Sequence, residues 1–166
     1  MLIVYIGLAI EKKLIFSYSP FNFNYADIVR NTINALKVDE EYRSSMHYKE
    51  NSMIYYIHSN YITYICIEGI QGGNSNTFNF LLDTKKEFES LFPNFDISNY
   101  NSSSITEIFK SKIEMKVDSY NNRESESNND RDKQTLLLEI QKEQSGYKEK
   151  NIIKGGNPNP FFVHFI

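Results

Sequence analysis

The chain contains little cysteine, no tryptophan, no long apolar run and no excess of positive charge. Cys66 is the single cysteine among 166 residues, which excludes an intrachain disulfide and a thiolate metal site and predicts a reducing compartment. No segment reaches the roughly 18–20 consecutive apolar residues that cross a bilayer, so no transmembrane segment is expected. The net charge is −3, and lysine and arginine are scattered, so the sequence contains no basic cluster of the kind that binds nucleic acid.

Residues suited to catalysis or to metal binding are few and far apart. The three histidines, His47, His58 and His164, form no metal-binding pattern. The loop at Gly72-Gly73 has neither the lysine nor the following Ser/Thr of a P-loop, which favours a flexible loop with a helix cap over a phosphate cradle. No two carboxylates are placed for acid/base catalysis. The sequence therefore predicts no catalytic residue, no cofactor, no metal site and no enzyme.

The strongest positive signal is a β-rich stretch from Met53 to Glu68. It predicts strands over Met53–Ile57 and Tyr61–Ile67, joined by the triplet His58-Ser59-Asn60. The second strand is apolar on both faces, whereas a strand with one wet face would alternate apolar and polar residues. We therefore expect helices on both faces of a central sheet.

A second hairpin is predicted at the start of the chain. Leu2–Ala9 and Leu14–Tyr18 are apolar runs separated by four residues, a spacing that favours antiparallel strands. The apolar start could also suggest a signal peptide, but it lacks a basic region and a small-residue cleavage site. It is interpreted as a buried strand.

Three helices and an edge strand complete the predicted domain. Tyr25–Lys37 and Thr77–Phe92 carry apolar residues at helical spacing, and a third helix is expected over Ser104–Val117 with a capping pattern at its first residue. Tyr42–Lys49 is more polar, as is typical of an edge strand. The predicted order over residues 1–117 is strand-strand-helix-strand-strand-strand-helix-helix.

The chain after residue 117 is predicted to be less ordered. Residues 118–134 contain no apolar residue except one tyrosine, a composition that indicates a disordered linker. The segment 135–166 begins with a partial helix in which Leu137, Ile140 and Tyr147 occupy heptad-compatible positions, and it is predicted to end as a disordered tail. The seam supports at most two heptads, which is too short for a sustained coiled coil.

The order of elements and several segments resemble the longin domain of the synaptobrevin-like, long VAMP-type R-SNAREs. These segments are the apolar pair Leu2–Ala9 and Leu14–Tyr18, the hairpin Met53–Glu68, and the helix Phe-Asn-Phe-Leu-Leu-Asp-Thr-Lys-Lys-Glu-Phe from Phe78 to Phe88. The resemblance implies a profilin-like α/β (α+β) fold. In that fold a five-stranded antiparallel sheet, in strand order 2-1-5-4-3, lies between one helix and two helices.

The resemblance also implies a function in vesicle-mediated transport and membrane fusion. Longin domains are regulatory modules that fold back on their own SNARE helix or hold trafficking adaptors, at the cytosolic face of vesicles or endomembranes. Their groove lies between the first helix and the third strand, which here places Ile28 and Thr32 opposite Met46 and Tyr48. The alternative is that these four are ordinary core or surface residues.

The chain departs from the family after the predicted domain. A long heptad region, a central-layer arginine and a transmembrane tail are expected there, but Arg123 and Arg131 lie in polar sequence without heptads. We expect either a sequence truncated or mis-spliced near Lys154, or a longin-only regulator without a complete SNARE helix. The alternative function is a soluble longin-like subunit of a trafficking adaptor or tethering complex.

Overall fold

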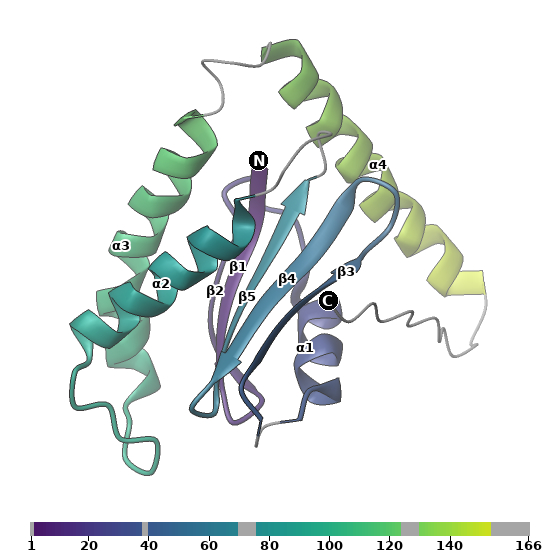
Figure 1. Ribbon diagram of the computed structural model, residues 1–166. Helices are drawn as coiled ribbons and strands as arrows, with labels where there is room; N and C mark the ends of the chain where they lie inside the picture. The colour runs from purple at the N-terminus through teal and green to yellow at the C-terminus, as the bar shows by residue number, and fades with distance from the viewer. Residues whose placement is uncertain (1, 38–39, 70–75, 124–129, 154–166) are drawn as a thin grey trace.

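A five-stranded antiparallel sheet in the order β2-β1-β5-β4-β3 forms the centre of the structure, a computed structural model (Figure 1). The structure describes residues 2–37, 40–69, 76–123 and 130–153. The strand order is the one that the resemblance implies, so this prediction is confirmed.

The sheet lies between helices on both faces. α1 (Ala26–Ala35) packs on one face, and α2 (Thr77–Leu91) and α3 (Ser102–Arg123) pack on the other (Figure 1). The buried side chains divide accordingly into one apolar cluster on each face of the sheet. The predicted layering of one helix against two is therefore confirmed.

The two most deeply buried strands are β1 (Leu2–Ile10) and β5 (Ile62–Gly69), which pair with each other. Every residue of both strands is buried, because helices cover both of their faces. This explains why the sequence of β5 is apolar in both phases. The flanking strands are β2 (Lys13–Tyr18), β4 (Ser52–Ser59) and, at one edge, β3 (Tyr42–His47).

The turn between β4 and β5 differs from the predicted triplet. Asn60 and Tyr61 form a two-residue turn, while His58 and Ser59 belong to β4. The register pairs His58 with Thr63, and their side chains share a hydrogen bond of 2.8 Å between Nδ1 and Oγ1. The prediction from the polar triplet was wrong because pairing between the strands, which the triplet does not reveal, sets the position and length of the turn.

A second two-residue turn lies beside it. Glu11 and Lys12 join β1 to β2, and the backbone N–H of Glu11 donates to the carbonyl of Tyr61 at 3.0 Å. The central residues of both turns have positive φ, namely 46° and 68° at Glu11 and Lys12 and 52° and 64° at Asn60 and Tyr61. Two positive φ values are the signature of the type I′ turn, which normally favours glycine. Both turns therefore use side chains where glycine would fit better.

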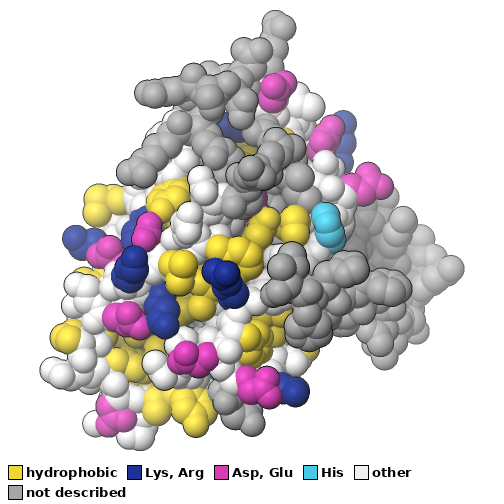
Figure 2. Space-filling model, viewed as in Figure 1, with side chains coloured by type: hydrophobic (Ala, Val, Ile, Leu, Met, Phe, Trp, Pro, Cys, Tyr) yellow, Lys and Arg dark blue, Asp and Glu magenta, His cyan; other side chains and the backbone are white. Residues whose placement is uncertain are grey.

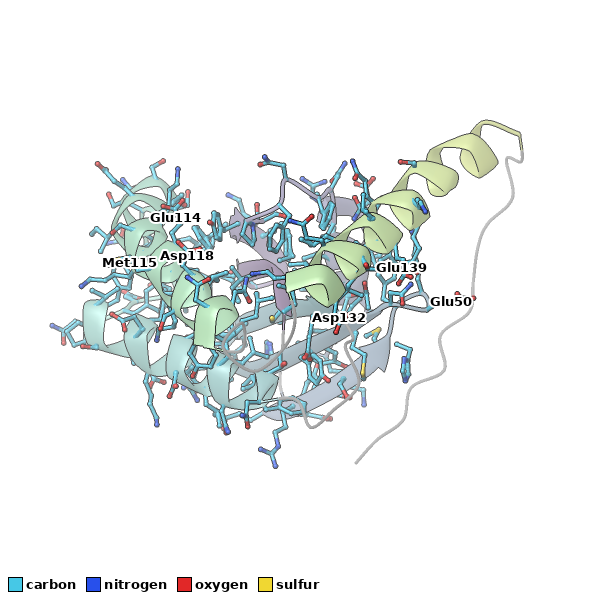
Figure 3. The ribbon with its side chains drawn as sticks, turned by 90° about the horizontal axis from the view of Figure 1, so that it is seen from above. Glu50, Glu114, Met115, Asp118, Asp132 and Glu139 are labelled. Carbon is cyan, nitrogen blue, oxygen red and sulfur yellow. The ribbon has the colours of Figure 1, made fainter. Side chains whose placement is uncertain are left out.

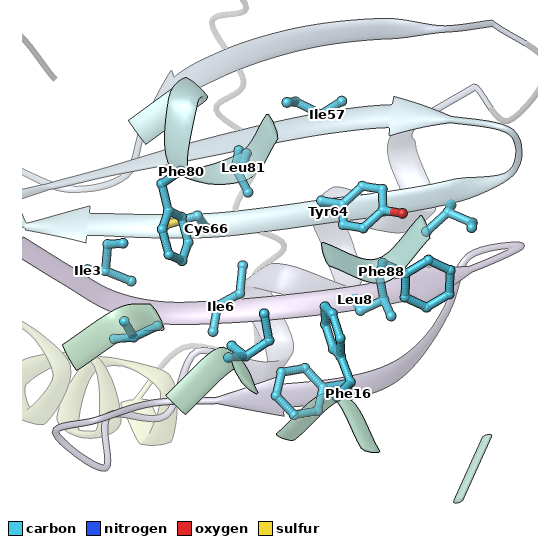
Figure 4. Packing of buried hydrophobic residues seen from close by; sticks show 14 of the residues in the cluster. Ile3, Ile6, Leu8, Phe16, Ile57, Tyr64, Cys66, Phe80, Leu81 and Phe88 are labelled. Atoms are coloured by element: carbon cyan, nitrogen blue, oxygen red, sulfur yellow. The ribbon is translucent and has the colours of Figure 1, made fainter. Parts of the chain in front are cut away.

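The α2/α3 face contains the larger apolar cluster. α3 buries the four residues that repeat every four positions along its predicted stripe, as the sequence indicated. Figure 4 shows labelled members from β1, β2, β4, β5 and α2 in contact at this face. The residues at its centre are Ile6, Leu8, Tyr64, Cys66, Phe80, Phe88, Ile105, Phe109, Ile113 and Val117.

α3 begins earlier than predicted. The side-chain Oδ1 of Asn101 accepts hydrogen bonds from the backbone N–H groups of Ser103 (3.0 Å) and Ser104 (3.1 Å), and it caps the helix. Ser104 therefore lies inside the first turn and does not open the helix as the capping pattern suggested.

The predicted linker over 118–134 is helical at both of its ends. α3 continues to Arg123, and α4 (Asp130–Ile153) begins inside the predicted linker. The buried Asn121 explains the longer α3, since its side chain accepts from the N–H of Ile3 at 2.7 Å and donates to the carbonyl of Ile3 at 3.0 Å. Composition alone cannot reveal such a polar pair. Residues 124–129 and the predicted tail over 154–166 lie outside the described residues.

Candidate partner-binding face

α4 packs on the same face of the sheet as α1, opposite α2 and α3. Figure 3 shows this arrangement from above, with Glu139 marking α4 and Asp118 marking α3. Two α4 side chains, Leu136 and Ile140, are buried in the apolar cluster that also contains Tyr25, the residue before α1. The sheet face predicted to bind a helix therefore carries one from the same chain.

Gly69, the last residue of β5, allows α4 to approach closely. A Cβ atom at Gly69 would lie 3.0 Å from a terminal methyl carbon of Leu136 and 3.0 Å from one of Ile140. Real Cβ contacts are rarely this short. The missing side chain therefore creates the space that the two α4 residues fill.

Leu136 and Ile140 packed over Gly69 form the α4 seam, and polar contacts hold α4 on two sides of it. Lys49 Nζ donates to the backbone carbonyl of Glu143 at 2.8 Å, and Asn51 Nδ2 donates to Glu143 Oε1 at 2.9 Å. On the other side the backbone N–H of Asn24 donates to Gln144 Oε1 at 3.2 Å. Burial lowers the pKa of Lys49, and the nearby charge of Glu143 opposes this shift. α4 is thus bound to the β3–β4 turn and to the segment that enters α1.

The predicted groove residues lie on this same face. Ile28, Met46 and Tyr48 are partly buried and pack against the cluster that contains the α4 seam. Tyr48 makes an edge contact with Tyr25, with ring centroids 6.1 Å apart. Thr32 is fully buried, and its hydroxyl has no hydrogen-bond partner among the described residues. Ile28, Met46 and Tyr48 thus lie at the edge of one apolar cluster, whereas Thr32 is buried.

A hollow of about 310 Å³ borders α4 on the side of the loop before α1. Phe21 and Phe23 line it from the loop, and Leu137 and Leu138 line it from α4. Leu137, predicted as a heptad position, therefore faces this hollow and is only partly buried. The side chain of Tyr147, the other predicted heptad position beyond the seam, lies outside the described part.

Sequence reasoning missed the polar contacts and the first apolar residue of the seam. Leu136 and Ile140 are four positions apart and therefore lie on one side of a helix, which was a usable signal. Glu143 and Gln144 extend the same side by one turn but are polar, so an apolar pattern could not identify them.

Potential metal ligands do not cluster in the described residues. No group of three or more metal-binding side chains occurs among them. Cys66 is fully buried, and burial together with the charge of Glu68 raises the pKa of its thiol well above the ordinary value. Within the same described ranges, no helix combines the length and the apolarity needed to cross a membrane.

A five-stranded antiparallel sheet with one helix against two, and a further helix held on the one-helix face, defines a profilin-like fold. The family model of the longin domain, described as a regulated-SNARE-like domain, matches residues 11–113. The match covers more than half of the chain, and the chain belongs to the longin family. It includes the predicted groove and ends before α4. Longin domains are regulatory modules rather than enzymes. No curated protein matches the chain.

Proposed function

We propose that this chain regulates SNARE-dependent vesicle transport by binding helices on the α1 face, and that α4 is the intramolecular occupant of that face. The observation that carries the proposal is the seam of Leu136 and Ile140 over Gly69, with polar contacts on both sides. Its partners are SNARE helices and trafficking adaptors at the cytosolic face of vesicles or endomembranes. Such a partner takes the place of α4.

The size of the α4 contact suits a reversible occupant. Burying two aliphatic side chains contributes about 4 kcal/mol in total, and the three hydrogen bonds add about 1 kcal/mol each. Holding the helix and its side chains in place costs conformational entropy of similar size. The net free energy of docking is therefore only a few kcal/mol, and a helix with a longer apolar stripe can displace α4.

The experiment uses a fluorescent peptide of residues 130–153, added to the full chain. In the variant Leu136→Asp with Ile140→Asp the chain's own α4 no longer competes, so we expect the peptide to bind about tenfold or more tightly than to the natural chain. The matched control is Lys142→Asp, because Lys142 is on the same helix but is exposed and outside the hollow, and it should leave the peptide affinity as in the natural chain. Fluorescence anisotropy gives both affinities.

Equal peptide affinity in the natural chain and the double variant would refute the intramolecular role of α4. The predicted groove is tested in the same opened background by adding Met46→Asp with Tyr48→Asp. We expect the thermal unfolding transition to stay cooperative and the peptide to be lost from calorimetric titrations. Unchanged affinity with intact unfolding would exclude the groove residues. A chain that binds no helix but forms stable complexes with large partners would instead indicate the adaptor or tethering role.

A further inference from the structure

A second and larger hollow, of about 550 Å³, lies at the other end of β5. It is bordered by the β4–β5 turn and by the C-terminal end of α2 with the segment that follows, at the lower end of the molecule in Figure 1. Gly69 and the α4 seam mark one end of β5, and Ile62 at this hollow marks the other. The hollow is therefore separate from the α4 site.

Aromatic side chains form much of its lining. Tyr64 and Phe88 are buried at its base with ring centroids 6.1 Å apart, and Figure 4 shows them together near the turn. Phe88 also contacts Phe92 and Phe95, at 4.9 Å and 5.3 Å between centroids. Both of these rings are only partly buried. They provide aromatic surface to an entering group.

The rim of the hollow is acidic. Glu89 and Asp96 line it, and Glu41 accepts a hydrogen bond of 2.6 Å from the lining residue Ser59. Lys85 is the only cationic side chain in the lining, and it is already engaged, donating to Ser59 Oγ at 2.9 Å and pairing with Glu89 at 3.7 Å.

The end of α2 adds to this negative field. Its last turn contains no basic residue, so the negative end of the helix dipole is not compensated by a side chain. Burial, and secondarily the charge of Glu89, raise the pKa of the Tyr64 phenol. In Figure 2 the lower part of the visible face shows apolar side chains bordered by both acidic and basic ones.

Tyr61 adds a further aromatic ring at the rim of the hollow. It has a φ of 64°, in the left-handed region where the type I′ turn favours glycine, and its side chain is 48% exposed at the rim. Half of the ring is open to solvent, so it can contact a group that enters the hollow.

We infer that this hollow binds an arginine side chain of a partner peptide. Aromatic rings attract the flat face of a guanidinium, and carboxylates accept its N–H groups in pairs. Glu89 and Asp96 supply carboxylates that the guanidinium would share with their present partners, which are Lys85 at 3.7 Å from Glu89 and the N–H and hydroxyl of Ser98 at 2.9 Å and 2.7 Å from Asp96 Oδ1. Tyr61 and Phe92 supply rings. Because the hollow and the α4 seam lie at opposite ends of the sheet, both can be occupied at once.

The test is a titration of the isotope-labelled full chain with Nα-acetyl-arginine amide, followed by amide chemical shifts. The control probe is Nα-acetyl-citrulline amide, which has nearly the same shape but no charge. We expect arginine to shift amides within 59–62 and 88–97 with a dissociation constant in the millimolar range, and citrulline to bind at least about fivefold more weakly. Equal shifts with both probes, or shifts confined to other acidic surface, would overturn the assignment.

Variants of the rim make the test sharper. Glu89→Gln should weaken arginine binding about fivefold, whereas the matched control Glu87→Gln should leave it unchanged. Glu87 is on the same helix but pairs with Lys116 at 3.4 Å, outside the hollow. Tyr61→Gly should weaken binding while the unfolding temperature stays equal or rises, because glycine relieves the strained φ. Natural affinity in Tyr61→Gly would refute the role of this ring, and opening α4 with Leu136→Asp and Ile140→Asp should not change arginine binding.

Discussion

Enlarging Gly69 is expected to separate the stability of the domain from the docking of α4. Gly69 is in β5, where glycine is unfavourable by about 0.5–1 kcal/mol relative to alanine. Alanine and then valine should therefore stabilise the strand, since β-branched residues suit a sheet. The same side chains would occupy the space that Leu136 and Ile140 fill, 3.0 Å from the position of the new Cβ.

The magnitude follows from the seam. Alanine meets only the flexible ends of two side chains, which can move by a few tenths of an ångström, so α4 docking should lose less than about 1 kcal/mol. Valine adds two methyl groups at the same place and should cost about 2 kcal/mol, roughly half of the free energy that the two aliphatic residues contribute. The loss should increase in the order glycine, alanine, valine.

Hydrogen exchange measures the two effects separately. Amides of residues 136–144 should exchange about 30-fold faster in Gly69→Val than in the natural chain, which corresponds to a loss of about 2 kcal/mol in local protection. Amides of β1 and β5 should exchange at the same rate or more slowly.

The control for this series is Gly7→Ala in β1. A Cβ at Gly7 would lie 3.0 Å from Ile65 and 3.2 Å from Leu14, inside the sheet packing and away from α4. It should destabilise the whole domain rather than release one helix. Unchanged α4 protection in Gly69→Val, or an equal loss of protection throughout the domain, would refute the proposed geometry of the seam.

Two further outcomes are expected. Asn121→Ala should lower the free energy of unfolding in urea by about 2–4 kcal/mol, because the N–H and the carbonyl of Ile3 both lose a buried partner. The control Asn122→Ala changes an exposed neighbouring position and should lower this free energy much less. Equal losses in the two variants would contradict the role of Asn121. Burial raises the pKa of Tyr5 to about 12, so the folded state holds a proton that the unfolded state releases above pH 10, and stability should fall as pH rises from 10 to 12. Thermal unfolding across this range should show a shallower fall in Tyr5→Phe, and an identical slope would show that Tyr5 is not responsible.

The sheet and its layers were predictable because they follow from repeated local patterns. The two-sided apolarity of β5 predicted helices on both faces, and the four-residue repeat of α3 predicted its buried side. The turn at Asn60-Tyr61 was not predictable from composition, because its position is set by pairing between strands. The extension of α3 depends on one polar residue, Asn121, which finds its partner 118 positions away in the sequence.

The candidate site was only partly predictable for a related reason. The resemblance located the α1 face, and Met46 and Tyr48 do lie on it, but Thr32 is buried beneath. That α4 docks on this face depends on a fit between Leu136 and Gly69, two residues whose proximity no local pattern encodes.

The three consecutive leucines of α4 bear on the proposal that this helix is a reversible occupant of the α1 face. Leu136 is buried against the domain, Leu137 and Leu138 line the neighbouring hollow, and Leu138 is 56% exposed. A single exposed leucine is ordinary on a protein surface, but this one lies beside the seam and stays accessible while α4 is docked. The proposed exchange therefore predicts that a partner helix contacts Leu138 before it displaces Leu136 from Gly69. The α1 face holds α4 by a short seam and leaves part of that helix accessible. This arrangement suits the replacement of α4 by a partner helix better than a permanent contact.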